Sequence, residues 1–124
     1  MQATLDAAAL CKMADRGQIT GGLLDGPLAF DNAISPEAVR IKGIVSQVAG
    51  DADIVLAPDL ESGNMLAKQL EYLGGAEGAG ILLGARVPVV LTSRADGPKA
   101  RSMSALLCAL VAQHQQSLRL GSLK

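Results

Sequence analysis

Short apolar runs alternate along this chain with segments that carry apolar residues at helical spacing, and this alternation constrains the fold more than any other feature. The runs in residues 52–59 (ADIVLAPD) and 78–93 (GAGILLGARVPVVLTS) are bounded or broken by acids, Gly and Pro, which predicts short strands. Residues 19–30 hold more broken runs, which indicate a strand or two at an edge or bend. Strands that alternate with helices predict a layered α/β sheet.

Helices are predicted between these strands from capping residues and from apolar spacing. A serine followed by proline and an acid is a strong helix start, and glycine is the usual residue just past a helix end. The first predicted helix runs from about residue 4 to 16, with Thr4 as N-cap and Gly17 near its end. The second starts at Ser35–Pro36, and Gly43 either weakens or ends it. The third contains Leu66, Leu70 and Leu73 and closes at Gly74–Gly75, and the last runs from about 98 to 117 with Pro98 in its first turn.

Composition excludes several function classes. The 124 residues are 49% hydrophobic, which favours a folded chain, but only 2% aromatic, so no aromatic surface exists for stacking bases. The net charge of −1 argues against nucleic-acid binding, and the apolar runs are too short to span a membrane. With no recognisable signal peptide, and with Cys11 and Cys108 far apart, we expect a cytoplasmic chain without disulfides. A single histidine, His114, leaves almost no ligands for zinc.

The most promising chemistry lies where the last apolar run meets the last helix, at LTSRADGP. Ser93 and Arg94 are expected beside a helix N-terminus, whose N–H groups favour anions, and the Arg guanidinium suits phosphate oxygens. From residue types alone, a purely structural role fits equally well: Ser93 would cap the helix and Arg94 would pair with Asp96 on the surface.

A second strand-to-helix junction, PDLESGNM, carries Asp59 and Asn64. Asp59 stands where acids stabilise a helix N-terminus, and Ser62-Gly63-Asn64 lets a ligand approach the backbone of this chain closely. Simple capping explains these residues better when they are taken alone. Asp25 and Asp31 flank another turn, in LDGPLAFDNA, and Asp-Gly-Pro is usually only a turn signal.

Taken together, DGPLAFD, VAGDADI, PDLESGNM and LTSRAD resemble, in order and spacing, the C-terminal part of the phosphate acetyltransferase and phosphate butyryltransferase family. The resemblance includes the transferase part of fused enoyl-CoA hydratase/phosphate acyltransferase proteins and runs from about Thr4 to about Val111. LTSRAD is more similar to the butyryltransferase-type branch.

The resemblance implies acyl transfer between coenzyme A and inorganic phosphate, with acyl-CoA as substrate and no bound cofactor. Ser93 and Arg94 match the family's Ser-Arg pair at the active-site cleft, so a hydroxyl near the CoA sulfur and a guanidinium on phosphate are expected. Asp25, Asp31, Asp59 and Asn64 lie in the other matching motifs and are candidate substrate-binding residues.

The family fold is a two-domain α/β/α arrangement similar to the isocitrate and isopropylmalate dehydrogenases. The resemblance assigns residues 1–92 to most of the second domain and residues 93–117 to the strand end and last helix of the first, followed by a frayed tail over 118–124. The family's dimer contact is built by this second domain, so a homodimer is expected.

This sequence departs from the family pattern in two ways. The acetyltransferase branch has a catalytic acid where this chain has Ala100, so Asp96, the nearest acid, is the candidate base. The family's catalytic unit is also more than twice as long, so a fragment or a non-catalytic dimerisation module remains open. A nicotinamide-dependent decarboxylating dehydrogenase is a weaker alternative, because Gly63-Asn64 stands where those enzymes carry metal-binding acids, and no metal is expected.

Overall fold

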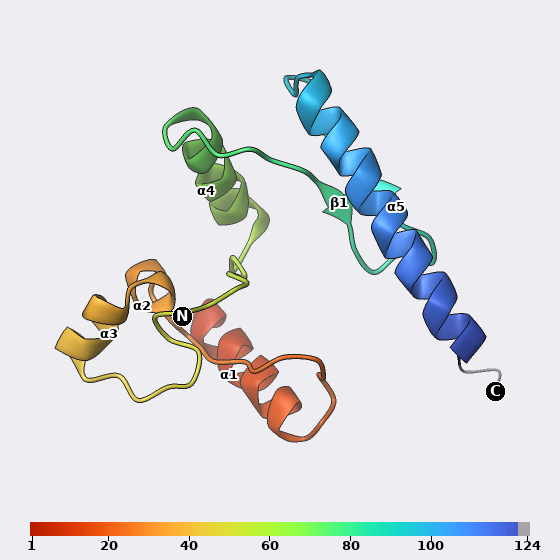
Figure 1. Cartoon of the computed structure of the whole chain (residues 1–124). Coiled ribbons are helices and arrows are strands. Elements are labelled where there is room, and N and C mark those ends of the chain that lie inside the picture. The colour runs from red at the N-terminus through yellow and green to blue at the C-terminus, as the bar shows by residue number, and fades with distance from the viewer. Residues whose placement is uncertain (122–124) are drawn as a thin grey trace. The chain divides into compact units, whose positions relative to one another are not determined.

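The computed structural model describes residues 1–121, with side chains through residue 118. The elements follow one another along the chain as five helices and two short strands over these residues (Figure 1). They are α1 (Gln2–Asp15), α2 (Phe30–Ile34), α3 (Pro36–Lys42), α4 (Leu60–Tyr72), β1 (Ile81–Leu82), β2 (Val89–Val90) and α5 (Pro98–Gly121). The last helix, predicted from 98 to about 117, continues to Gly121. The frayed tail over 118–124 stays a prediction, and its residues 122–124 lie outside the described part.

The chain forms two compact units, Met1–Gly63 and Asn64–Lys124. The first unit contains α1 to α3 and the start of α4, and the second contains the rest of α4, both strands and α5. The predicted assignment of residues 1–92 and 93–117 to two domains of a larger enzyme stays a prediction.

Helix α1 ends as its sequence predicts but begins differently. Gly17 has a φ of +70°, its N–H donates to the Ala14 carbonyl, and the Gln18 N–H donates to the Met13 carbonyl. This pair of bonds is the Schellman motif, which requires a residue with positive φ, and glycine adopts it at least cost. The predicted cap at Thr4 is wrong because the helix begins at Gln2, with Met1 as N-cap and no side-chain cap bond.

Helix α3 confirms its predicted start and end. The Ser35 hydroxyl accepts a hydrogen bond from the Ala38 N–H at 3.3 Å, and Pro36 occupies the first turn, where its missing N–H costs nothing. Gly43 closes the helix with a φ of +63°. Capping signals that act over three or four residues therefore suffice to define this helix.

The strands predicted in residues 19–30 and 52–59 do not form. A strand needs a neighbour to satisfy its backbone groups, and the described residues offer none for either segment. The chain entering the second segment bonds instead to α2: the Gly50 N–H, just before the segment, donates to the Asn32 carbonyl at 2.8 Å, and the N–H of Ala52, its first residue, donates to the Ala33 carbonyl at 3.1 Å. Ala33 is buried at this contact.

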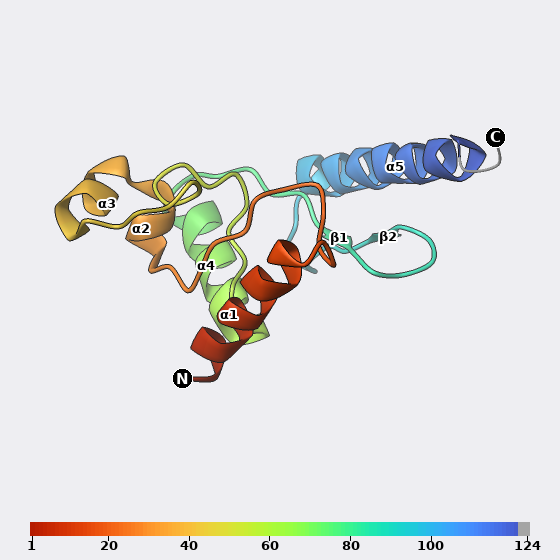
Figure 2. The same cartoon turned by 90° about the horizontal axis from the view of Figure 1, so that it is seen from below.

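The second unit is built around an antiparallel pair of strands, in which Ile81 lies opposite Val90 and Leu82 opposite Val89. Helix α5 packs on both strands, and they lie beside it in two perpendicular views (Figures 1 and 2). Buried Ser104 joins the layers: its hydroxyl accepts from the Gly80 N–H at 3.0 Å and donates to the Ala100 carbonyl at 2.7 Å.

Small residues, rather than the large aliphatic ones, make the more covered face of α5. Ala100, Ser104 and Cys108 are buried or half-buried and repeat every four residues. Met103, Leu106 and Leu110 also have helical spacing, yet they are 47%, 58% and 63% exposed. Helical spacing thus predicted the helix but did not indicate which face would be covered. Over residues 1–121, no helix combines the length and apolarity needed to cross a bilayer.

The described fold is therefore mostly helical with one small two-stranded sheet. Helices and strands are both present, as predicted.

Candidate functional site

The Ser93–Asp96 segment between β2 and α5 is a tight turn held by its own polar groups. The Asp96 carboxylate accepts a hydrogen bond from the Ser93 N–H at 2.7 Å, and the Asp96 N–H donates to the Ser93 carbonyl at 3.2 Å. The Ser93 hydroxyl accepts from the Ala95 N–H at 3.3 Å. We call residues 93–96 the SRAD loop.

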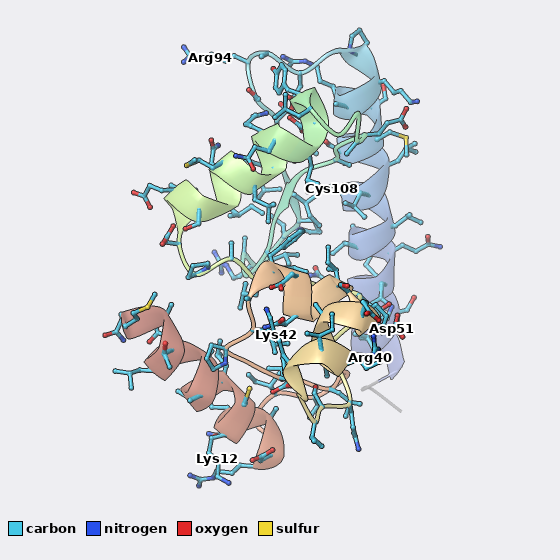
Figure 3. The ribbon with its side chains drawn as sticks, turned by 90° about the vertical axis from the view of Figure 1, so that its left-hand side faces the viewer. Lys12, Arg40, Lys42, Asp51, Arg94 and Cys108 are labelled. Atoms are coloured by element: carbon cyan, nitrogen blue, oxygen red, sulfur yellow. The ribbon has the colours of Figure 1, made fainter. Side chains whose placement is uncertain are left out.

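The contacts expected for a purely structural role of Ser93 and Arg94 do not form. Ser93 does not cap α5, since that helix begins at Pro98 and its first backbone bond runs from the Arg101 N–H to the Gly97 carbonyl. Among the described residues, Arg94 makes no ion pair with Asp96, whose carboxylate is bonded to Ser93 instead. Arg94 is exposed and its side chain points away from the loop (Figure 3).

Arg101 holds the SRAD loop from the first turns of α5. Its guanidinium donates to the carbonyls of Asp96 at 3.0 Å, Ser93 at 3.3 Å and Arg94 at 3.4 Å. Sequence reasoning did not single out this residue, because its partners lie five to eight positions earlier and no local pattern indicates such a contact.

An open pocket of about 290 Å³ lies beside the loop within the second unit. Asp96, Lys99 and Ala100 line one side, while Tyr72 at the end of α4 and Glu77 after it line another. The Lys99 ammonium pairs with the Glu77 carboxylate. Of the three predicted catalytic residues, Ser93, Arg94 and Asp96, the half-buried Asp96 is therefore the one that lines this pocket.

Lys68 adds positive charge near this pocket. Its ammonium lies 2.7 Å from a Glu71 carboxylate oxygen and 5.7 Å from the centre of the Tyr72 ring. The hydrogen bond to Glu71, followed by the negative charges of Glu71 and Asp96, raises the pKa of Lys68 above its ordinary value. Lys68 therefore stays protonated near neutral pH.

Asp59 caps helix α4. Its carboxylate accepts from the Ser62 N–H at 2.7 Å and from the Ser62 hydroxyl, and these bonds lower the pKa of Asp59 below its ordinary value. The capping role considered from sequence is therefore present, and it occupies one carboxylate oxygen. Asn64 lies exposed in the second turn of the same helix.

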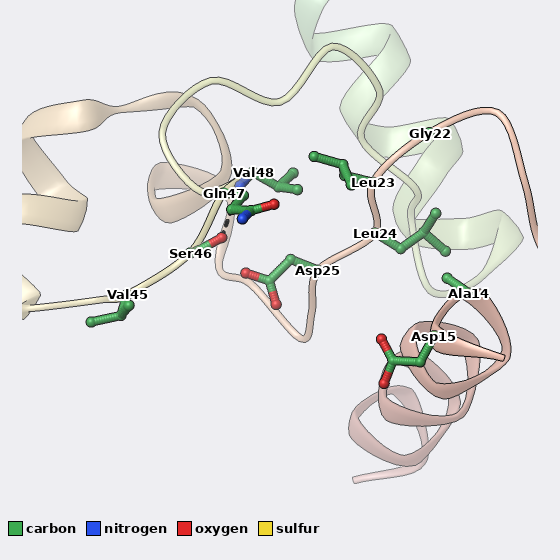
Figure 4. A pocket seen from close by; sticks show the side chains of 10 residues that line it. All are labelled: Ala14, Asp15, Gly22, Leu23, Leu24, Asp25, Val45, Ser46, Gln47 and Val48. Carbon is green, nitrogen blue, oxygen red and sulfur yellow. Dashed lines mark hydrogen bonds between the residues drawn. The ribbon is translucent and has the colours of Figure 1, made fainter. Parts of the chain in front are cut away.

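Asp31 and Asp25 have different surroundings within the first unit. Asp31 pairs with the Lys42 ammonium at 2.6 Å, and this hydrogen bond lowers the pKa of Asp31. Asp25 lines an open pocket of about 450 Å³ with Asp15, Leu23 and Val45, and the two carboxylates are visible on its walls (Figure 4).

The structure therefore brings Ser93 and Asp96 into direct contact, with Arg94 between them in the chain. No hydrogen bond or ion pair joins Asp25, Asp31 and Asp59 to one another, although all belong to the first unit of the described chain. Arg101, Ser104 and Lys68 are the functional or structural residues that sequence reasoning missed.

Comparison with known proteins identifies the family of this chain. The family model described as "Phosphate acetyl/butaryl transferase" matches residues 1–109. The chain belongs to the phosphate acetyl/butyryl transferase family. Within this family, the phosphate acetyltransferase of Rhizobium meliloti is 60% identical over 119 residues, or 96% of this chain and 38% of the relative. The phosphate butyryltransferase of Clostridium acetobutylicum is 54% identical over 112 residues, or 90% of this chain and 37% of the relative.

A solved structure has a similar fold. The branched-chain phosphotransacylase from Enterococcus faecalis V583 superimposes with a TM-score of 0.73 and 35% identity, covering 88% of this chain and 39% of that one. The chain thus spans somewhat more than a third of the length of the relatives it matches.

Proposed function

We propose that this chain is part of an acyltransferase that moves an acyl group between coenzyme A and inorganic phosphate. Acyl-CoA and phosphate give acyl phosphate and CoA: a phosphate oxygen attacks the thioester carbonyl, the C–S bond breaks, and the CoA sulfur takes up a proton. The family match supports this reaction, and the observation that carries the proposal is the SRAD loop, which joins a hydroxyl, a free guanidinium and a carboxylate in one turn.

Arg94 is proposed to bind phosphate. Its exposed side chain makes no hydrogen bond within the described residues, so the planar guanidinium is available for two parallel bonds to phosphate oxygens. There it would hold phosphate in line with the thioester and offset charge as the carbonyl becomes tetrahedral.

Ser93 and Asp96 are proposed to serve the sulfur side of the reaction. The Ser93 hydroxyl accepts one bond from Ala95 and keeps its own proton, which it can donate toward the CoA sulfur. Asp96 would take the thiol proton in the direction that forms acyl-CoA. Since the Ser93 N–H occupies one of its oxygens, the other oxygen is the proposed proton acceptor.

The four remaining candidates, Asp25, Asp31, Asp59 and Asn64, are proposed to contact different parts of the substrates. Asp25, Asp31 and Asp59 are carboxylates, which accept hydrogen bonds and repel phosphate, so they suit amide and hydroxyl donors of acyl-CoA. Asp25 has the best support, because it faces a pocket. Asn64 can donate as well as accept and is the one candidate suited to a phosphate oxygen.

The layered α/β/α arrangement of the dehydrogenase type, the homodimer and the cytoplasmic location are proposed for the complete enzyme. The exposed large aliphatic side chains of α5 support burial of this helix against further polypeptide.

No bound cofactor is proposed. A non-catalytic dimerisation module of the same family is the alternative, and the exposed apolar side chains of α5 are equally consistent with it.

A chimera tests the proposal. This chain replaces the matching segment of the R. meliloti phosphate acetyltransferase, and release of CoA from acetyl-, propionyl- and butyryl-CoA is measured with and without phosphate. Phosphate-dependent CoA release is expected, and its loss on replacing Arg94 with Ala would tie it to the SRAD loop. A folded, dimeric chimera without activity would favour the non-catalytic module.

A further inference from the structure

We infer that Arg101 is a positioning residue for the SRAD loop: its guanidinium ties down the carbonyls of Ser93, Arg94 and Asp96 and so sets the direction in which the loop presents its reactive groups. This inference deepens the proposed function. The effect of Arg101 on catalysis rests on that proposed function. The contact itself belongs to the chain whatever the reaction is.

The geometry of the contact favours an arginine. A guanidinium is planar and carries several N–H donors in fixed directions, so a single side chain can serve carbonyls that face it from different points of a turn. Here the Nε donates to Asp96, and one terminal nitrogen donates to both Ser93 and Arg94. A lysine ammonium has donors at one point only and cannot reproduce this spread.

Two sets of hydrogen bonds thereby hold the loop. The Asp96 carboxylate accepts from the Ser93 N–H, and Arg101 donates to the carbonyls of three loop residues. Arg101 starts from the rigid first turns of α5, which Ser104 in turn bonds to the chain before β1. While Arg101 occupies these carbonyls, their oxygens are directed toward its guanidinium and are not presented to a phosphate bound by Arg94.

The first test needs no activity. Hydrogen exchange is measured in the full chain for the N–H groups of Ser93, Ala95 and Asp96, with those of residues 106–114 of α5, in the same unit, as an internal reference. Arg101→Met should speed exchange in the loop roughly five- to tenfold, the effect of losing about one net hydrogen bond, and leave the reference residues unchanged. Arg101→Lys should fall between. Arg40→Met, which removes a guanidinium that pairs only with Glu37, should leave the loop unchanged.

The second test uses the chimera. Arg101→Met should lower kcat/KM for phosphate about tenfold while the KM for acyl-CoA changes less than about twofold, because the loop groups act on phosphate and on the reacting sulfur, whereas most contacts that bind acyl-CoA lie elsewhere. Arg101→Lys should restore part of this loss. An inactive chimera whose loop still loosens with Arg101→Met would overturn the proposed function and keep the positioning role. Loop exchange that does not change, or that rises only together with exchange of residues 106–114 of α5, overturns the inference.

Discussion

At the scale of single residues, the candidate site depends on groups that already have defined partners. Asp96 is bonded to Ser93, Asp31 to Lys42 and Asp59 to Ser62, whereas Arg94 is exposed and directed away from the loop. The structural role of a carboxylate that already has a partner can be measured without substrate. The proposed role of the Arg94 guanidinium, in contrast, can be tested only with a ligand that binds it.

Replacing Arg94 with Lys in the chimera should therefore impair the use of phosphate more than the binding of acyl-CoA. Lysine keeps the charge but loses the two parallel bonds, a loss of roughly 1.5–3 kcal/mol for a charge-assisted hydrogen bond. The specificity constant for phosphate should fall about tenfold to a hundredfold. Initial rates with each substrate varied in turn measure the effect, and Arg40→Lys, at a surface ion pair, is the matched control. Unchanged phosphate saturation in the Arg94 variant would remove Arg94 from the site.

Asp59 should make the free energy of unfolding depend on pH in the acid range. Hydrogen bonds from Ser62 lower its pKa in the folded chain, so its charged form stabilises the fold above the unfolded pKa, and this contribution is lost as the pH falls through the lowered folded value. Asp59→Asn keeps a good cap without the ionisation, so the advantage of the wild type near pH 7 should vanish in acid. Urea titrations followed by circular dichroism at several pH values measure the difference in free energy of unfolding between the wild type and Asp59→Asn. The same change at exposed Asp53 is the control for losing a surface carboxylate. A difference that does not vary with pH would show that the charge plays no part.

At the scale of elements, a single buried hydroxyl connects the sheet to the last helix. Ser104 is 1% exposed and bonds both Gly80 before β1 and Ala100 one turn earlier in α5. Gly80 itself leaves no room for a side chain, since a Cβ there would lie 2.4 Å from the Leu91 carbonyl oxygen. The contact between strand and helix is thus specified by small residues on both sides.

Removing the Ser104 hydroxyl should destabilise the second unit. Ser104→Ala leaves the Gly80 N–H without its acceptor, which costs about 1–3 kcal/mol for a buried group. Ser117→Ala is the control, because Ser117 makes the same bond to the carbonyl four residues earlier but is exposed and has no strand partner. Hydrogen exchange of the Gly80 and Leu91 N–H groups reports the effect. Equal effects of the two substitutions would mean that the link to the strand contributes nothing.

At the scale of the whole molecule, the chain leaves many large apolar side chains exposed. Besides the α5 residues, Leu5, Ile41 and Leu73 are 64%, 70% and 86% exposed, and few described residues are fully buried. Such a surface is costly in water and marks contacts with further polypeptide.

We expect the isolated chain to form a homodimer at micromolar concentration, because pairing two copies covers part of this surface. Light scattering together with analytical ultracentrifugation measures the mass. Replacing Leu106 and Leu110 of α5 with Gln tests whether that helix contributes, and the same change at the exposed Leu5 of α1 is the control. A stable monomer over this concentration range would contradict the expectation.

We also expect the isolated chain to turn over acyl-CoA and phosphate at least roughly a hundredfold more slowly than the chimera. In the proposed function, other parts of the enzyme contribute groups that orient the substrates and exclude water, and the chimera supplies them from the acetyltransferase relative, of which the chain spans 38%. A CoA-release assay on both proteins gives the ratio. Ordinary enzymatic rates from the chain alone would show that it carries a complete site.

Local signals in the sequence determined the parts of this protein that depend on a few neighbouring residues. Ser35 and Gly43 bounded α3, Pro98 began α5, and LTSRAD indicated where a hydroxyl and a guanidinium follow a strand. Caps, prolines and glycines act through sterics and hydrogen bonds over three or four positions, so they can be read without knowing the fold.

Only the tertiary structure decided which surfaces are covered and which distant groups meet. The apolar runs in residues 19–30 and 52–59 suggested strands that do not form, because strand formation depends on a partner and not on the run itself. The covered face of α5 carries Ala100, Ser104 and Cys108, although its leucines are the more apolar residues. Arg101 reaches back to the SRAD loop because the turn after β2 folds onto the start of α5, and no spacing in the sequence encodes that contact.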